Sequence, residues 1–151
     1  MADSVTATFR RPFAEQTAAW RLRLGNLLPS RAWDDVWKES HDRGFMVAGA
    51  MKADLLARLA EAVGKSIEDG RSLEEFRRDF RQIVADTGWH GWTGEETAAG
   101  RAWRTRVIYQ TNLLSTYATG RYAQLRAAGF PLWVYRHGGS LEPREQHLSW
   151  D

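Results

Sequence analysis

Four residues near the end of the sequence have side chains suited to acid–base or metal chemistry: His137, Glu142, Glu145 and His147. Three ligands of the Glu and His type can hold a hard or borderline metal ion. Their spacing, however, matches neither HExxH nor a paired HxH arrangement that would fix the geometry. Arg144 and His147 share a face of a helical turn and could instead bind a backbone carbonyl or a carboxylate. We therefore favour a structural role for this pair and predict no catalytic residue, metal or cofactor.

The other chemistry-bearing residue types also favour structural roles. His41 lies between Trp37 and Phe45 on an apolar face, which is typical of a core histidine, whereas His90 lies among glycines where solvent contact is expected. The sequence contains no Gly-rich phosphate loop and no Ser-centred elbow. It also contains no cysteine, so neither a disulfide scaffold nor a thiolate zinc site can form.

The charge is distributed unevenly. No Asp or Glu lies between Thr97 and Leu141, and this segment contains six arginines, so the rest of the chain carries about −4 when the whole carries +2. Such asymmetry suggests an acidic or polyanionic partner, although solvated arginines with no function are the commoner explanation of a basic run.

The elements that position these residues are predicted to be mainly helices. We expect a first helix over residues 14–28, ended by Pro29. Ser30 can cap a second, in which Trp33, Trp37, His41 and Phe45 share a face. A third helix carries an apolar stripe from Met51 to Ile67, and a fourth begins at the Ser72–Glu75 capping box and ends at Gly88.

A longer helix is expected to follow the glycine-rich loop GWHGWTG, residues 88–94, which cannot itself be helical. Thr93 and Glu96 form a second capping box, so we predict a helix from about Glu95 to Ala128. At 100° per residue, one apolar stripe is predicted as the core face on which shorter helices pack: Trp103, Val107, Leu114, Ala118 and Leu125.

Arg121 follows Trp103 by five helical turns and is therefore predicted to lie on the same core stripe. A buried arginine needs a partner for its charge. The partner could be an acid, for which Glu142 and Glu145 are the candidates within this chain, or backbone carbonyls, or a neighbouring chain. Gly120 would leave room for another backbone to approach. The alternative is that the Arg121 side chain extends to the edge of the helix.

The last part of the sequence changes pattern. The segment FPLWVYRH, residues 130–137, alternates like an edge strand with Pro131 near its start. The predicted fold class is mainly α, a helical domain with one long central helix and a short C-terminal β segment. We divide it into an N-terminal arm (1–12), a helical region (13–88), a hinge loop (89–94), and the long helix with the start of a C-terminal domain (95–151) that we expect to continue past residue 151.

Eight tryptophans in a chain that is 43% hydrophobic supply large rings for a core or for a partner surface. Trp89, Trp92 and Trp150 fall in loops or ends, so we predict that they expose apolar surface for an assembly to cover. No stretch approaches 18 consecutive apolar residues, so no membrane contact is predicted.

The order of these motifs resembles the phage Mu F-like minor head proteins, the phage head morphogenesis family. The resemblance covers the chain from about Pro12 onwards. Its most specific parts are Asn112, Tyr117, Gly120 and Arg121 in the predicted long helix, and Arg144 three residues before His147. The family usually has R-P-E-H at the last motif, where this chain has R-E-Q-H. The resemblance also rests on the following segments, in this order: PFAEQ, HDRGFMVAGAMKADLL, GRSLEEFRRDF, TGWHGW and FPLWVYRH.

The resemblance implies a structural virion component and not an enzyme. The expected role is that of a minor capsid protein at or near the portal, acting in head assembly and DNA packaging, in the host cytoplasm during assembly and then in the virion. The expected partners are the portal protein, other capsid proteins and packaged DNA. The interaction candidates are Arg121, Asn112, Tyr117, Gly120, Arg144, His147, Trp89 and Trp92.

Two alternatives from other classes remain open. A non-specific nucleic-acid-binding module would bind DNA of any sequence with a steep dependence on salt. A metal-dependent hydrolase or transferase centred on His147 would lose activity on His147→Ala with its fold intact.

Overall fold

The computed structural model describes residues 14–32, 34–35, 40, 43–135, 141–142 and 144–149. The described residues form helices and one isolated bridge, without a strand, so the mainly α class is confirmed. Most of the predicted second helix, including Trp33, Trp37 and His41, lies outside them. The helices are α1 (Ala14–Leu24), α3 (Ala53–Glu68), α4 (Leu73–Thr87), α5 (Ala98–Ala127) and α6 (Glu145–Leu148).

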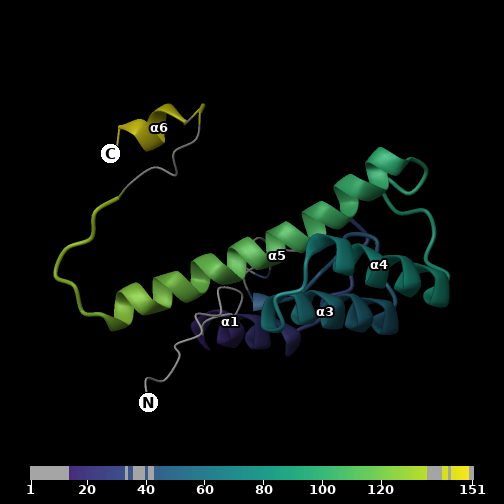
Figure 1. Cartoon of the computed structure of the whole chain (residues 1–151), viewed down its shortest axis with the longest axis horizontal. Coiled ribbons are helices and arrows are strands. Elements are labelled where there is room, and N and C mark those ends of the chain that lie inside the picture. The colour runs from purple at the N-terminus through teal and green to yellow at the C-terminus, as the bar shows by residue number, and fades with distance from the viewer. Residues whose placement is uncertain are drawn as a thin grey trace, which may run out of the picture.

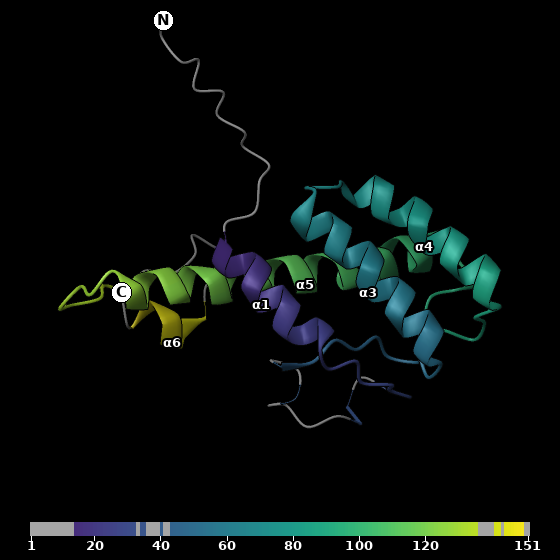
Figure 2. The same cartoon turned by 90° about the horizontal axis from the view of Figure 1, so that it is seen from below.

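Helix α5 is the longest element, as predicted, with 30 residues and a length of about 45 Å. It is not central, because α1, α3 and α4 all lie on one side of it, as Figures 1 and 2 show. Its opposite side faces away from these three helices along its whole length. None of the helices in the described part of the chain is long and apolar enough to cross a membrane.

The α3–α4 pair follows the local sequence signals closely. The predicted capping box is confirmed: the Glu75 backbone N–H donates to Ser72 Oγ, and the Ser72 N–H donates to Glu75 Oε2 at 2.8 Å. Gly88 ends α4 in the left-handed conformation, with φ of 62°, which glycine adopts without strain. Helix α3 begins at Ala53 and buries the predicted stripe, except for Met51, which precedes the helix and is exposed.

The first helix ends four residues earlier than predicted. The chain leaves α1 at Leu24 because residues 26–28 form a short parallel bridge with Phe45. The Leu28 N–H donates to the Phe45 carbonyl at 2.9 Å, and the Phe45 N–H donates to the Asn26 carbonyl at 3.0 Å. Phe45 is therefore a bridge residue and not part of a helix. Its ring instead meets Trp20 edge-on, with ring centroids 5.5 Å apart, and both side chains are fully buried.

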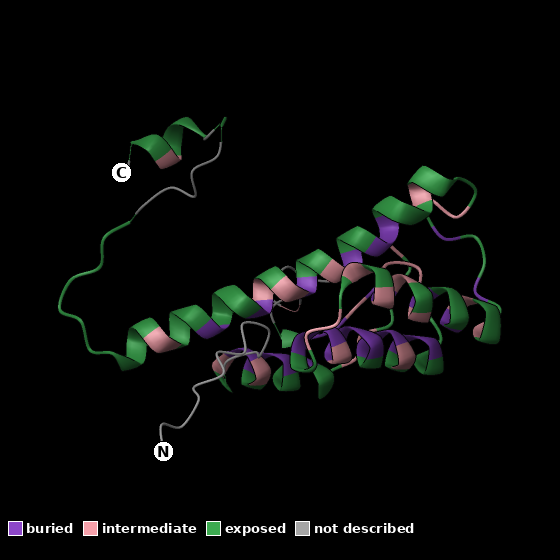
Figure 3. Cartoon of the chain, viewed as in Figure 1, coloured by how far each residue is buried: buried purple, intermediate pink, exposed green. Residues whose placement is uncertain are grey.

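The loop tryptophans are part of the core, which corrects the prediction that they are exposed. Trp89 and Trp92 are 7% and 6% exposed, and both rings contact Phe80 of α4 with centroids within 6.0 Å. The Trp89 Nε1–H donates to the Gly49 carbonyl at 3.1 Å. The loop thus folds back over α3 and α4, and Figure 3 shows the buried residues gathered where these elements meet. Trp150 lies outside the described residues.

Two further predictions around α5 fail. The helix is capped by Thr97, whose Oγ1 accepts the Gly100 N–H at 2.9 Å, and not by a Thr93–Glu96 box. Residues 130–135 form no strand and are exposed. An alternating sequence forms a strand only when a neighbouring strand takes up its backbone hydrogen bonds, and the described part of the chain offers none.

The contact between Gly64 and Trp20 yields a first prediction. A Cβ added at Gly64 would lie 2.9 Å from Trp20 Nε1, and the indole is fully buried and cannot move aside. Gly64→Ala should therefore lower the free energy of unfolding by about 1–2 kcal/mol, because overpacking outweighs the gain in helix propensity. Urea denaturation measures this directly.

Gly25→Ala is the matched control, because its added Cβ would make only an ordinary 3.6 Å contact with the Leu22 carbonyl oxygen. It should change stability by less than about 0.5 kcal/mol. Equal stability of the two variants would show that the Trp20–Gly64 contact does not constrain the packing of α1 on α3.

Candidate interaction surface

The packed side of α5 is built from short and polar residues. Its buried positions lie mostly four residues apart, on the side facing the other helices: Arg104, Thr105, Ile108, Asn112, Thr116 and Gly120. Thr105, Asn112 and Thr116 make hydrogen bonds within the helix. Thr116 Oγ1 donates to the Asn112 carbonyl at 2.7 Å, and Asn112 Nδ2 donates to the Ile108 carbonyl at 2.8 Å. Such side chains can be buried at little cost, because their hydrogen bonds are kept.

Helix α1 packs closely along this side. Gln16 is buried, and its Nε2 lies 3.4 Å from both the Leu113 carbonyl oxygen and Thr116 Oγ1. Nearer the end of α1, Arg23 Nη1 donates to Ser115 Oγ at 2.8 Å. The interface between α1 and α5 therefore depends on close approach and hydrogen bonds, with little contribution from large apolar side chains.

The predicted core stripe of α5 is wrong by about half a turn of the helix. Trp103 and Leu114 are 43% and 66% exposed, and Val107, Ala118 and Leu125 are exposed as well. These positions point away from α1, α3 and α4, on the side of α5 that is green in Figure 3. We call five of the exposed residues on this side the apolar face of α5: Trp103, Val107, Leu114, Tyr117 and Leu125.

The apolar face runs from Trp103 to Leu125, over about 33 Å of helix. Large apolar side chains that are exposed along one side of a helix favour a site of association. No carboxylate lies on the helix, and Arg106 and Arg121 are exposed among or beside the apolar residues. The face therefore combines apolar contact area with positive charge.

The predicted interaction residues of α5 divide between its two sides. Asn112 and Gly120 are buried on the packed side, whereas Tyr117 belongs to the apolar face. Arg121 is exposed, and its Nη1 donates to Gln124 Oε1 at 2.7 Å. The prediction that Arg121 is buried and paired with an acid is wrong, because the stripe that was expected to carry it inward faces outward.

The buried arginine of α5 is Arg104, which the sequence analysis did not single out. One Nη2 hydrogen bond reaches the Ala48 carbonyl, and Nε has no partner among the described residues. Burial lowers the pKa of the Arg104 guanidinium, since the charged form loses its hydration. The signal that could have located it is its spacing of four residues from Ile108 and eight from Asn112.

The final segment contains the predicted pair of Arg144 and His147 and most of the predicted group of His and Glu side chains. His147 follows Arg144 in one helical turn, as predicted, and its N–H donates to the Arg144 carbonyl at 2.8 Å. The His147 ring lies against Tyr135 with centroids 6.3 Å apart. His137 lies outside the described residues. Within the described ranges, no three His, Asp or Glu side chains gather closely enough to hold a metal ion.

The loop before α5 is organised by one carboxylate. Glu95 Oε1 lies 2.9 Å from His90 Nδ1, and Oε2 accepts the Gly91 backbone N–H. The hydrogen bond from His90 and the one from the Gly91 amide hold the pKa of Glu95 below its ordinary value of 4.5. We call these two contacts of Glu95, with His90 and with the Gly91 amide, the Glu95 clasp. They fix the turn that places Trp92 in the core.

Comparison with known proteins adds independent information. The chain is 29% identical over 136 residues, 83% of its length, to protein F of Escherichia phage Mu, whose name describes it as a candidate capsid assembly protein. It is also 29% identical over 123 residues, 78% of its length, to the Mu-like prophage FluMu F protein of Haemophilus influenzae. The resemblance to the Mu F proteins is confirmed.

The match is partial on the side of the relatives. The chain spans 30% of the length of each of these two F proteins. No family model matches the chain, and no solved structure matches it. The similarity therefore takes in about four fifths of this chain but less than a third of the F proteins.

Two substitutions of Arg104 are predicted to change the free energy of unfolding in opposite directions. Burying a charge without a carboxylate costs several kcal/mol, more than the roughly 1.5–3 kcal/mol returned by one charged hydrogen bond. Arg104→Met, which keeps the stem and removes the charge, should raise the free energy of unfolding by about 1 kcal/mol. Arg104→Ala should lower it by creating a cavity.

Arg121→Ala is the control for this pair, and its stability should stay within about 0.5 kcal/mol of the parent, because the side chain is exposed. Chemical denaturation of the variants separates these outcomes. If Arg104→Met destabilised as much as Arg104→Ala, the charge would be better solvated than its burial implies.

The Glu95 clasp predicts a dependence on pH. A carboxyl whose folded pKa is lowered contributes stability above its unfolded pKa and loses it as the pH falls through the folded value. Glu95→Gln should therefore melt below the parent at neutral pH, and the difference should shrink as the pH falls below 4.5 and through the lowered pKa of folded Glu95.

The melting temperatures of both proteins across this range provide the measurement. Glu96→Gln, at the exposed neighbouring position, should show no such convergence. A difference between parent and Glu95→Gln that persists unchanged at low pH would mean that the carboxylate charge does not hold the loop.

Proposed function

We propose that this chain belongs to a minor capsid protein of a Mu-like tailed phage, a structural component of the virion that acts at or near the portal in head assembly and DNA packaging. The proposal is supported by the similarity to two F proteins, one of which is named for capsid assembly. It is assembled in the host cytoplasm and then remains in the virion.

The observation that carries this proposal is the apolar face of α5. Trp103, Leu114 and Leu125 present large side chains to solvent on one side of the longest helix, while smaller and polar residues fill its packed side. Covering apolar surface stabilises an assembly by roughly 25 cal/mol per Å² before the costs of association. A partner in an assembly is the simplest way to bury the apolar face of α5.

The charge of this surface favours a partner other than a second copy. Two copies facing each other through α5 would bring Arg106 and Arg121 together with no acid on either helix, and like charges across an interface oppose association. A capsid or portal protein that presents acidic residues around an apolar patch would match it. DNA is a poorer match, because phosphates gain nothing from exposed Trp103 and Leu114 side chains.

The apolar face can be tested by placing a charge on it. Leu114→Asp should abolish retention of the cognate portal and capsid proteins in a pull-down, and should reduce the yield of DNA-filled heads when the variant replaces the parent in an infection. Thermal denaturation should change little, because Leu114 is 66% exposed.

Leu22→Asp on α1 is the matched control, since Leu22 is also exposed but lies on another helix. It should retain both activities. The proposal would be abandoned if Leu114→Asp assembled like the parent, and also if the parent sedimented as a compact monomer and retained neither portal nor capsid protein.

A further inference from the structure

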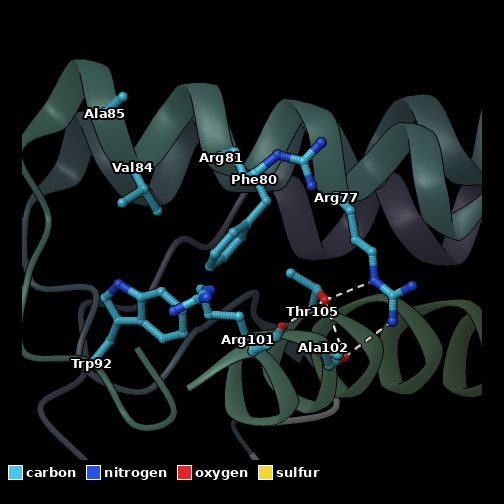
Figure 4. Close-up of a pocket in the computed structure, with 10 residues that line it drawn as sticks. Arg77, Phe80, Arg81, Val84, Ala85, Trp92, Arg101, Ala102 and Thr105 are labelled. Atoms are coloured by element: carbon cyan, nitrogen blue, oxygen red, sulfur yellow. Dashed lines mark hydrogen bonds between the residues drawn. The ribbon is translucent and has the colours of Figure 1, made fainter. Parts of the chain in front are cut away.

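A pocket of about 370 Å³ lies between α4 and the start of α5. Its walls are apolar: Phe80, Val84 and Ala85 come from α4, Trp92 from the preceding loop, and Ala98 and Ala102 from α5. Thr105 of α5 and three arginines, at positions 77, 81 and 101, complete the lining, and Figure 4 shows them with the apolar residues between the two helices.

The pocket is a fixed feature of the packing. Arg77 crosses from α4 to α5, where Nε donates to Thr105 Oγ1 at 3.2 Å and Nη2 donates to the Ala102 carbonyl at 3.3 Å (Figure 4). This bridge holds the two helices at a set spacing. The α5 residues that line the pocket include Ala98 and Ala102, whose side chains are too short to fill the space.

The three arginines differ in how their charges are met. Arg77 pairs with Glu74 on its own helix. Arg101 Nη1 donates to the Glu95 backbone carbonyl at 2.7 Å, which satisfies a hydrogen bond but leaves the charge unneutralised. Arg81 is exposed and makes no hydrogen bond or ion pair with the described part of the chain. Two unneutralised guanidiniums, one on each helix, therefore flank an apolar pocket.

No acidic side chain is among the residues that line the pocket. The pocket thus offers apolar contact and two cations.

We propose that this pocket binds an acidic segment of a partner protein, with one apolar side chain inserted between α4 and α5 and the carboxylates beside it paired with Arg81 and Arg101. A pocket of this size accommodates one leucine or aromatic side chain with its adjoining backbone. A nucleobase fits less well, because its polar edge would be buried against the aliphatic walls formed by Val84, Ala85 and Ala98 without hydrogen-bond partners.

This site is separate from the apolar face of α5. Ala98, Ala102 and Thr105 lie on the packed side of the helix, toward α4, whereas Trp103 and Val107 point the other way. Loss of binding at one surface therefore leaves the other intact, and the tests of the two can fail independently.

The test uses the full chain and a fluorescein-labelled peptide in which one phenylalanine is flanked on each side by two glutamates, with fluorescence anisotropy as the readout. The parent should bind the peptide saturably, and added salt should weaken binding. Arg81→Glu should weaken it at least about tenfold, since it replaces an attraction by a repulsion. Arg78→Glu, an equal charge change on α4 outside the pocket, should weaken it less than about twofold.

A second pair of variants tests the apolar part of the site. Ala102→Phe, which fills the pocket, should abolish binding, whereas Ala99→Phe, at an exposed position of α5 that does not line it, should bind like the parent. Circular dichroism and melting curves confirm that each variant is folded. A peptide with serine in place of phenylalanine should bind at least about tenfold more weakly than the original.

Four outcomes would overturn the proposal. The first is the absence of saturable binding of the peptide to the parent, and the second is an equal loss of peptide affinity in Arg81→Glu and Arg78→Glu. The third is tighter binding of phenylacetate or of a short oligothymidylate than of the peptide. The fourth is self-association of the chain that Arg81→Glu abolishes. The last three would assign the interaction to general charge attraction, to a small ligand or nucleic acid, and to a second copy of the chain, respectively.

Discussion

The close packing of α1 against the short, polar side of α5 is the constraint on which the rest of the structure depends. Gln16 and Thr116 meet at the centre of this contact, where both are buried. Short side chains on α5 let α1 approach, and the internal hydrogen bonds of Asn112 and Thr116 remove the penalty for burying them. Because this side of α5 is the packed one, its larger apolar side chains are turned outward.

The accuracy of sequence-based prediction depended on whether a feature is local. The Ser72–Glu75 cap, the end of α4 at Gly88 and the buried stripe of α3 from Leu55 to Ile67 were predicted correctly, because each is determined within one or two helical turns. The existence of α5 was predicted for the same reason. The side of α5 that packs could not be predicted from its apolar stripe. Such a stripe indicates a surface that tends to be buried, but it does not say whether another helix of the same chain or a partner protein buries it.

Burial was predicted wrongly for several individual residues, because their burial depends on tertiary contacts. Arg121 was placed in the core only because Trp103 was, and Arg104 was overlooked because it lies among polar neighbours. Trp89 and Trp92 were expected at the surface because their loop cannot be helical, yet the loop folds back and stacks them on Phe80. The strand expected over 130–137 needed a partner strand, and alternation in the sequence cannot supply one.

The acid-free segment explains why both surfaces remain positively charged. Each arginine of α5 with an identified partner meets a neutral group: Arg101 and Arg104 meet backbone carbonyls, Arg121 a glutamine amide, and Arg126 the Tyr122 hydroxyl and ring. Neutral oxygens satisfy donors but do not cancel charge, so the potential around the helix stays positive. A partner that covers the apolar side chains of this region without adding acidic groups would bring these charges out of water unpaired, at a high cost. The physical requirement on any partner is therefore the same at both surfaces, namely apolar side chains together with carboxylates.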